Sequence, residues 1–275
     1  MVAIVADSAA NLPGGLAEEL GIRLVPLYLR VGERSYRDGL DLATADLYAR
    51  LARGEGPVST SAPTWEDFLG AFEATRAGEV LCVTVASTMS GAHAQALVAA
   101  ERYAGRVVVL DSRSASMAEG FVALEAARAA AGGAGLDEVA SRAREVAARA
   151  RLFATVGTFE FLRRSGRVNA LAAWAATALD LKPVFAFVDG APRGVARPRT
   201  RRRALDRIVD ETLAAIGGRP AHVAALHAAA EGEARDVLAR VEAGAEVVER
   251  HVVEATPVIG AHVGPGLVGA CLFTD

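Results

Sequence analysis

Short runs of β-branched residues alternate with alanine-rich helical patterns through the first half of the sequence, and this alternation restricts the fold more than any other feature. Strands separated by helices of this length pair in parallel through right-handed crossovers. The expected strands cover residues 2–5, 22–29, 80–85 and 107–110, and the expected helices cover 16–20, 45–53, 65–76, 91–103, 115–131 and 137–150. We therefore predict an α/β protein whose N-terminal domain, residues 1–150, is a mainly parallel α/β sandwich.

The second half has a different pattern, in which strands follow one another more closely. The expected strands cover residues 152–156, 182–188, 194–196, 223–226, 246–253 and 268–273, with helices over 204–216 and 234–243. Asp189-Gly190, between two of these strands, is typical of a hairpin turn. The pattern predicts a separate C-terminal α+β domain with a mixed sheet, residues 151–275.

Composition excludes several classes of protein. A chain with 52% hydrophobic residues buries enough surface to fold, and its 33 acidic and 30 basic residues argue against a dedicated nucleic-acid binder. Cys82 and Cys271 each lie in an apolar run, which predicts buried free thiols in a reducing compartment. The N-terminus has no signal-peptide pattern and no metal-ligand spacing is present, so we expect a cytoplasmic protein without a metal.

Two long uncharged stretches, residues 80–100 and 255–274, resemble membrane spans in length. The centre of the first is the polar segment Ser87–Gly91, and the second contains Pro257, Pro265 and four glycines. A spanning helix does not tolerate such a polar or Pro/Gly-rich centre. Each stretch is better interpreted as a buried strand, a tight loop and another buried element.

Hydroxyl residues precede the expected helix at 65–76. Thr64 and Asp67 have the spacing of an N-terminal cap, which accounts for Thr64 but not for the pair Thr60-Ser61. Hydroxyl donors just before a helix N-terminus also suit an anion, because unpaired amides point outward there. A cap alone and an anion site both remain open for this segment.

The segment Ser87–His93 joins a buried strand to a buried helix and carries three hydroxyls in four residues. Ser90 stands where the helix begins, and Gly91 permits a close approach of the backbone. A capped turn and an anion site are both consistent with this pattern. The sequence has neither the P-loop pattern nor the glycine fingerprint of dinucleotide-binding proteins.

His262 lies in an apolar segment between glycines, where we expect a bent backbone close to another element. A lone histidine of this kind is most often a hydrogen-bonded core residue. Paired with Ser61 or Ser90 it could instead be a general base, or it could donate to a carboxylate.

Arginines stand out at two places. Arg167 follows Gly166 and precedes an apolar helical pattern, which makes it a candidate anchor for an anion. The main charge cluster consists of Arg197, Arg199, Arg201 and Arg202 with Arg203 and Arg207. Cations in the first turn of the helix that Thr200 caps oppose the helix dipole, so we predict contact with a phosphate-bearing group or an acidic partner.

Taken in order, these segments resemble the DegV family of bacterial lipid-binding proteins. Each is short, and their joint order is what makes the resemblance specific. The matching segments are Asp7-Ser8 with Leu12-Pro13, Pro26-Leu27, Tyr36-Arg37-Asp38, Thr60-Ser61-x-Pro63, Ser87-x-x-Ser90-Gly91, Asp111-Ser112, Gly166-Arg167, Lys182-Pro183 with Asp189-Gly190, Arg197-x-Arg199 and His262-x-Gly264-Pro265-Gly266.

The resemblance implies a protein that binds one long-chain fatty acid in a tunnel between its two domains. Family members of known role are the fatty-acid-binding subunit of bacterial fatty acid kinase, which presents the carboxylate to a separate ATP-dependent kinase subunit. The implied protein is not catalytic alone, needs no cofactor, binds no nucleic acid and allows transient contact with a membrane.

The resemblance also implies roles for individual residues. Ser61, Ser90 and His262 would bind the carboxylate, and Thr60, Gly91 and Arg167 would lie at the same site. Arg197, Arg199, Arg201 and Arg202 would lie near the head group or on the surface that faces the kinase. The chain departs from the family pattern at Ala62, where glutamine is frequent, at Ala92, where threonine is usual, and at Ser165, where glycine is common.

Two other functions compete with a fatty-acid carrier. A serine hydrolase could use Ser90 or Ser61 with His262, although the Gly-x-Ser-x-Gly elbow is absent from the sequence. The third hypothesis is an α/β protein that binds a sugar or a phosphate. We favour the carrier because of the family resemblance, since the fold alone does not select a function.

Overall fold

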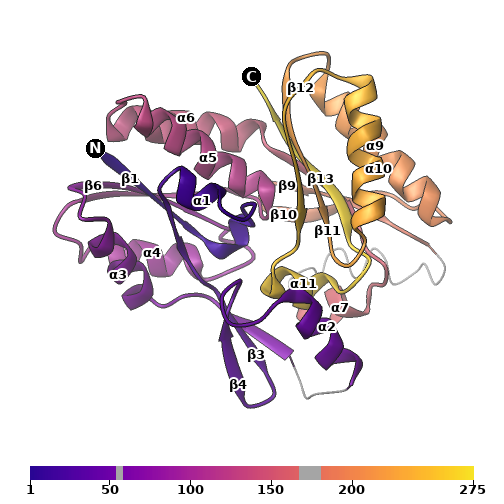
Figure 1. Cartoon of the computed structure of the whole chain (residues 1–275), viewed down its shortest axis with the longest axis horizontal. Coiled ribbons are helices and arrows are strands. Elements are labelled where there is room, and N and C mark those ends of the chain that lie inside the picture. Colours follow the sequence, from indigo (N-terminus) through magenta and orange to yellow (C-terminus); the bar gives the residue numbers. More distant parts are fainter. Residues whose placement is uncertain (54–57, 167–180) are drawn as a thin grey trace.

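The computed structural model describes residues 1–53, 58–166 and 181–275, and Figure 1 shows their arrangement. The described strands form a parallel sheet, a mixed sheet and a small antiparallel sheet. The predicted α/β class, with a parallel sheet in the first half and a mixed sheet in the second, is confirmed. Of the helices in the described ranges, none is both long and apolar enough to cross a membrane.

The parallel sheet has the strand order β2-β1-β6-β7, and all its neighbours run in the same direction. Its strands are β1 (Val2–Asp7), β2 (Ile22–Val25), β6 (Glu79–Thr84) and β7 (Arg106–Asp111). Side chains alternate across a strand, so Val80 and Cys82 face α3 (Trp65–Thr75) and α4 (Ala92–Ala100), whereas Leu81 and Val83 face α5 (Met117–Ala131) and α6 (Leu136–Arg149). The sheet is therefore covered by helices on both faces, as parallel sheets usually are.

The mixed sheet has the order β10-β9-β8-β13-β11-β12. Among the described strands of this sheet, β11 and β12 pair in parallel and all other neighbours pair antiparallel. Its strands are β8 (Arg151–Thr155), β9 (Val184–Val188), β10 (Ala191–Ala196), β11 (Ala221–His227), β12 (Val247–Glu254) and β13 (Val268–Thr274). The helices α9 (Arg201–Ile216) and α10 (Glu231–Gly244) pack on one face. Asp189-Gly190 forms the predicted turn between β9 and β10.

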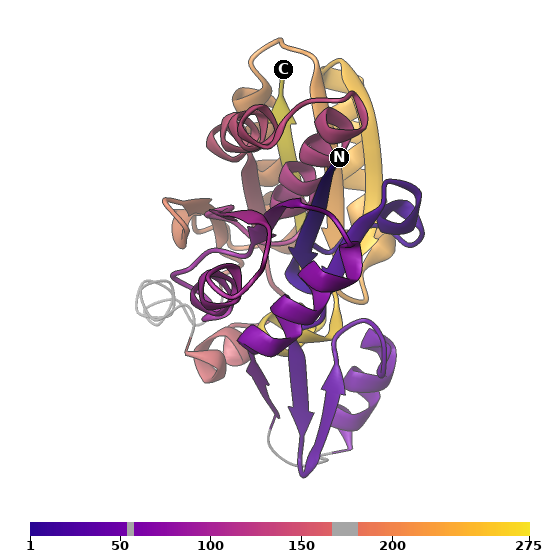
Figure 2. The same cartoon turned by 90° about the vertical axis from the view of Figure 1, so that its left-hand side faces the viewer.

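The pair α5–α6 lies between the two large sheets (Figures 1 and 2). One hydrophobic core joins both sheets through these helices, and it includes Leu81 of the parallel sheet, Phe121 of α5 and Phe273 of β13. Phe121 and Phe273 are fully buried, with ring centroids 5.3 Å apart. Cys82 and Cys271 are buried free thiols, as the sequence predicts.

The prediction of one strand over residues 22–29 is wrong. Pro26 interrupts it, because proline has no N–H for a strand ladder, and the chain passes from β2 into a different sheet. The next strand, β3 (Tyr28–Val31), pairs antiparallel with β4 (Arg34–Arg37) and β5 (Val58–Ser61). This small sheet projects from the end of the molecule (Figure 2), and α2 (Thr44–Ala52) lies beside it.

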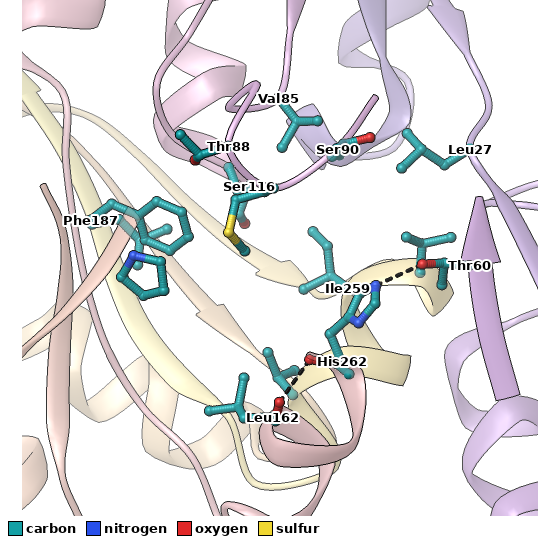
Figure 3. Close-up of a pocket in the computed structure, with 18 of the residues that line it drawn as sticks. Leu27, Thr60, Val85, Thr88, Ser90, Ser116, Leu162, Phe187, Ile259 and His262 are labelled. Carbon is teal, nitrogen blue, oxygen red and sulfur yellow. Dashed lines mark hydrogen bonds between the residues drawn. The ribbon is translucent and has the colours of Figure 1, made fainter. Parts of the chain in front are cut away.

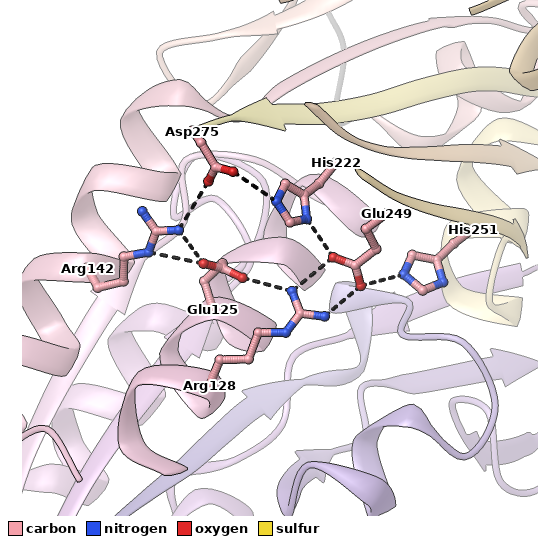
Figure 4. A network of polar contacts seen from close by, with 7 residues as sticks. All are labelled: Glu125, Arg128, Arg142, His222, Glu249, His251 and Asp275. Carbon is pink, nitrogen blue, oxygen red and sulfur yellow. Dashed lines mark hydrogen bonds and ion pairs between the residues drawn. The ribbon is translucent and has the colours of Figure 1, made fainter. Parts of the chain in front are cut away.

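A network of charged side chains fixes α5 and α6 to the mixed sheet (Figure 4). Arg128 of α5 donates to both carboxylate oxygens of Glu249 on β12, at 2.9 and 2.6 Å. His222 and His251 contact the same carboxylate at 2.6 and 2.9 Å. Burial alone would raise the pKa of Glu249, but the hydrogen bonds from these three side chains lower it well below its usual range.

The short helices complete the path of the chain. They are the 3-10 turn η1 (Ser8–Ala10), α1 (Leu16–Glu19), α7 (Glu160–Ser165) and α11 (Pro257–Val263). The helix α11 belongs to the second half of the sequence, yet it packs against α2, β3 and β5 of the first half. It therefore brings C-terminal residues to the small sheet.

Candidate functional site

A pocket of about 450 Å³ lies where the loops at the carboxyl ends of β1 and β6 face α11 and the mixed sheet. This volume is within the range of pockets that bind small organic ligands. Figure 3 shows that Thr60 and His262 lie on one side of it, whereas Phe187 lies on the other. The pocket therefore has a polar end and an apolar end.

His262 is on a helix, not in the bent segment that the flanking glycines led us to expect. Thr256 caps α11 by accepting a hydrogen bond from Ile259 N at 3.5 Å, and Pro257 occupies the first turn, where its missing N–H costs nothing. Gly264 ends the helix with φ at +68°. A Cβ atom at Gly260 would lie 2.7 Å from Oη of Tyr48, so glycine is required for α11 to approach α2 this closely.

The side chain beside His262 is that of Thr60, whose Oγ1 lies 2.8 Å from His262 Nε2. Thr60 is on β5 of the small sheet, so the contact joins this sheet to α11. Which of the two groups donates depends on the tautomer of the imidazole ring. The pair places a hydroxyl and an imidazole, two groups that can donate hydrogen bonds, at the lining of the pocket.

Ser61 and the capping residues that follow it have separate places. Ser61 is the last residue of β5, lines the pocket and is exposed. Thr64 and Asp67 form the predicted capping box of α3, in which Thr64 N donates to Asp67 at 2.8 Å. The structure therefore uses Thr64 as a cap and leaves Thr60 and Ser61 at the pocket.

The connection from β6 to α4 supplies the hydroxyls of the second candidate segment. Ser87 donates to Asp111 at 2.6 Å, and Thr88 donates to the carbonyl of Gly190 in the hairpin turn. Ser90 lines the pocket, and its Oγ accepts a hydrogen bond from Ala92 N at 3.2 Å. The segment is thus a turn held by local hydrogen bonds, and it also places Ser90 and Gly91 at the N-terminus of α4, where a negative charge is stabilised.

The backbone conformation at residue 91 does not require glycine. Its φ is −73°, and an added Cβ atom would lie 3.8 Å from Cβ of Ala62, which is an ordinary contact. We expected another element to approach the backbone closely at Gly91. No part of the described chain does so.

The arginine candidates in the described part of the chain do not line this pocket. Arg167 lies outside the described residues. Arg197, Arg199, Arg201 and Arg202 are absent from the described pocket lining. Arg201 donates to Glu233 of α10 at 3.0 Å, so packing between α9 and α10 accounts for part of the cluster, whereas Arg199 and Arg202 are exposed.

Sequence reasoning missed the apolar wall of the pocket. The mixed sheet provides it through Leu152 and Ala154 on β8, Phe185 and Phe187 on β9, and Leu226 on β11. Within β8 and within β9, the two wall residues are two positions apart and so share one face of the strand. This spacing was visible in the sequence, but the choice of face depends on how the two sheets meet.

The turn between β9 and β10 connects the apolar end to the parallel sheet. Thr88 donates to the Gly190 carbonyl, and Arg113 forms an ion pair of 2.7 Å with Asp189. Both contacts join the loops that follow β6 and β7 to this turn. Because Thr88, Phe187 and Pro192 line the pocket, these contacts close one of its borders.

Comparisons with known proteins agree with this architecture. The sequence profile described as "Uncharacterised protein, DegV family" matches residues 1–275. The chain belongs to the DegV family. A DegV domain-containing protein of Mycobacterium tuberculosis is 38% identical over 274 residues, which is 98% of this chain and 96% of that protein. One of Streptomyces coelicolor is 35% identical, with the same coverage.

Solved DegV structures have the same fold. A fatty-acid-binding DegV family protein from Thermus thermophilus superimposes with a TM-score of 0.95 at 29% identity, covering 100% of this chain and 99% of that one. DegV of Bacillus subtilis, described as a fatty acid binding protein, has a TM-score of 0.87 at 26% identity, with the same coverage. The DegV resemblance predicted from the sequence motifs is therefore confirmed.

Proposed function

We propose that this DegV protein binds one long-chain fatty acid in the pocket between its N-terminal and C-terminal parts, residues 1–150 and 151–275. The carboxylate is bound by Thr60, Ser61, Ser90 and His262, next to Gly91. Arg167, which the sequence predicts for the same site, lies outside the described residues. The acyl chain extends along the wall formed by the mixed sheet. The protein does not catalyse a reaction by itself and needs no cofactor.

The observation that carries this proposal is the two-sided character of the pocket. The hydroxyl–imidazole pair at 2.8 Å and the start of α4 supply donors at one end, and leucines, phenylalanines and alanines form the other. A buried carboxylate must be satisfied by hydrogen bonds, which these donors can provide. The proteins of Thermus thermophilus and Bacillus subtilis described as fatty-acid-binding have the same fold, which supports the choice of ligand.

The apolar end supplies most of the affinity. A chain of about 16 carbons gains roughly 12 kcal/mol of gross transfer free energy, at about 0.8 kcal/mol for each methylene. Each hydrogen bond to the carboxylate contributes about 1.5–3 kcal/mol. We therefore assign affinity to the wall of the pocket and orientation of the ligand to the polar end.

We further propose that the protein presents the carboxylate to a separate ATP-dependent kinase subunit, which forms the acyl phosphate. Two observations support this role. Ser61 at the polar end is exposed, so the head group lies near the surface. Arg199 and Arg202 are exposed cations suited to a phosphate or an acidic partner, with Arg197 and Arg201 beside them. The buried thiols fit the reducing cytoplasm in which we place the protein.

The serine hydrolase is the weaker candidate. It needs an imidazole that activates a serine hydroxyl. The hydroxyl at His262 Nε2 is that of Thr60, and Ser90 Oγ accepts a hydrogen bond from Ala92 N. These contacts favour binding of an anion over attack by a nucleophile.

Lipid analysis of the purified protein tests the proposal directly. We expect native mass spectrometry followed by organic extraction to identify a bound long-chain fatty acid, and we expect delipidated protein to bind palmitate or oleate. Protein that is isolated empty and then binds neither acid would exclude the carrier function. For the kinase role, charge reversal at Arg199 and Arg202 should abolish acyl-phosphate formation by the partner while palmitate binding is unchanged.

A further inference from the structure

Asp7 is the last residue of β1 and Ser8 follows it, at the carboxyl end of the parallel sheet; the two are 0% and 7% exposed. Neither lines the pocket, so the proposed contacts to a fatty acid do not use them. A buried carboxylate and hydroxyl are costly unless other groups satisfy them. Their hydrogen bonds show what they do in this fold.

Asp7 fixes two backbone segments at once. One of its carboxylate oxygens accepts from Ala9 N and the other from Val85 N, each at 2.9 Å. Ala9 follows β1 and Val85 follows β6, and both line the pocket. The carboxylate of Asp7 therefore sets the spacing of the two loops that form the N-terminal side of the pocket.

Ser8, the next residue in the sequence, forms hydrogen bonds that extend to Asp38, which follows β4. Ser8 Oγ accepts from Leu27 N at 3.0 Å and donates to Asp38 Oδ2 at 2.7 Å. Asp38 is 3% exposed, and its Oδ1 accepts from Val258 N at 2.9 Å. Leu27 and Val258 both line the pocket, so the same pair of side chains fixes two more of its segments.

The link to Val258 extends to the head-group end. Val258 is in the first turn of α11, and His262 is four positions later, on the next turn of the same face. The helix is only seven residues long, so the place of its N-terminus determines the place of His262. Asp38 thus places a carboxylate at the N-terminus of α11, the end of a helix that favours one.

We propose that Asp7, Ser8 and Asp38 are positioning residues of the pocket: they join four of the segments that line it, and Asp38 sets His262 at Thr60. The expected effect on ligand affinity rests on the proposed fatty-acid site. The expected effect on the position of His262 does not, because the contact between His262 and Thr60 is made within the protein.

Substitution of Asp38 tests the proposal. Asp38→Ala removes both bonds, whereas Asp38→Asn retains an oxygen for Val258 N and an amide that donates to Ser8. A matched control is Thr212→Val, which removes a fully buried hydroxyl bonded to Ile208 O at 2.7 Å in α9, away from the pocket. Urea unfolding measures the stability of all three variants, and palmitate titration measures their affinity.

The second measurement is the position of His262 itself. The chain has five histidines, so ¹H–¹⁵N spectra of the imidazole rings are simple, and His262→Gln assigns the signal of interest. We expect Asp38→Ala to displace the His262 ring signals and to weaken palmitate binding about tenfold or more, the effect of losing one hydrogen bond to a charged group. Asp38→Asn should keep the His262 ring signals close to their wild-type positions and retain most of the affinity for palmitate. Thr212→Val should change neither, although it loses stability.

Unchanged His262 signals in Asp38→Ala would overturn the proposal, and so would an affinity loss no larger than that of the control. If Asp38→Ala does not fold, Ser8→Ala takes its place and should displace the same signals by a smaller amount. If the wild-type protein binds no palmitate, the proposed function fails, and the ring signals alone decide whether Asp38 positions His262.

Discussion

Oγ1 of Thr60 lies 2.8 Å from Nε2 of His262, although the two residues are 202 positions apart in the chain. The contact depends on three features described above: the small sheet that carries Thr60, the glycine that lets α11 approach α2, and the hydrogen bond from Val258 N to Asp38. It places a hydroxyl–imidazole pair at the polar end of the pocket.

Replacing Thr60 by valine should weaken binding of palmitate about tenfold to a hundredfold. The substitution keeps the shape of the side chain but removes a hydrogen bond to a charged group, which is worth about 1.5–3 kcal/mol. Isothermal titration of delipidated protein measures the change. Thr60→Ser is the matched control and should remain within about threefold of the wild type. Equal losses in both variants would show that the hydroxyl is not the group that matters.

A larger side chain on the apolar wall should select for shorter acids. Ala154 is 1% exposed and lines the pocket, so Ala154→Leu places additional methyl groups where the acyl chain lies. Crowding of this kind costs about 1–3 kcal/mol, so palmitate should bind about tenfold more weakly. Octanoate, which ends before the wall, should be affected much less. The proposed orientation of the chain is wrong if both acids lose affinity equally.

The contacts of the hairpin turn should slow release of the ligand. Thr88→Val removes the hydrogen bond to Gly190 O at the border of the pocket. We expect a faster dissociation rate of palmitate in stopped-flow exchange, by about threefold to tenfold, because a hydrogen bond contributes about 1 kcal/mol. Arg113→Met removes an ion pair whose side chains are 59% and 68% exposed, and it should have little effect. The turn is no barrier to release if Thr88→Val leaves the rate unchanged.

A pair of buried acids should make stability depend on pH. Asp7 and Glu119 are fully buried, and the charge of Asp7 disfavours ionisation of Glu119. Burial raises the pKa of Asp7 to about 7 and that of Glu119 well above its usual value. The folded state therefore binds more protons than the unfolded chain, and the free energy of unfolding falls as the pH rises from about 4 through 7.

Glu119→Gln tests this dependence because it removes one of the two ionisable groups. We expect the stability of the variant relative to the wild type to increase between pH 5 and pH 9, as measured by urea unfolding. Glu66→Gln, at an exposed position, is the control and should follow the wild type at every pH. If the free energy of unfolding depends on pH in the same way in all three proteins, the prediction that Glu119 binds a proton in the folded state is wrong.

Arg128 should contribute to stability through its contact with Glu249. Its replacement by methionine leaves Glu249, half-buried on β12, without its bidentate partner, which should cost about 1–3 kcal/mol. Chemical denaturation measures this loss. Arg235→Met, which breaks an exposed pair on α10, is the control and should cost much less.

Local patterns predicted the elements of this fold well where propensity and periodicity agree. The strands around Val80 and Val107 and the caps at Thr64 and Thr200 were visible in the sequence because short-range chemistry fixes them. The small sheet was missed because its strands are four residues long and partly exposed, so their residues show little alternation. Pro26 was the signal that the long strand ends.

The site was predictable in part for the same reason. Ser90 and His262 stood out as polar residues in uncharged stretches, and Ser61 as part of a hydroxyl pair. The pairing of Thr60 with His262 was not predictable, because it depends on how α11 packs on the small sheet. The charge network around Glu249 was equally hidden, since its members come from α5, α6, β11 and β12.

The position of α5 and α6 between the two large sheets has a practical consequence for dividing the protein. Most of α5 is buried, and its neighbours include β1 on one side and β13 on the other. A fragment that ends at Ala150 would present an apolar helical face to water, and a fragment that begins at Arg151 would lack the cover of its sheet. Two such fragments would each need the other to fold, which makes this boundary suited to a complementation reporter whose reassembly restores the pocket.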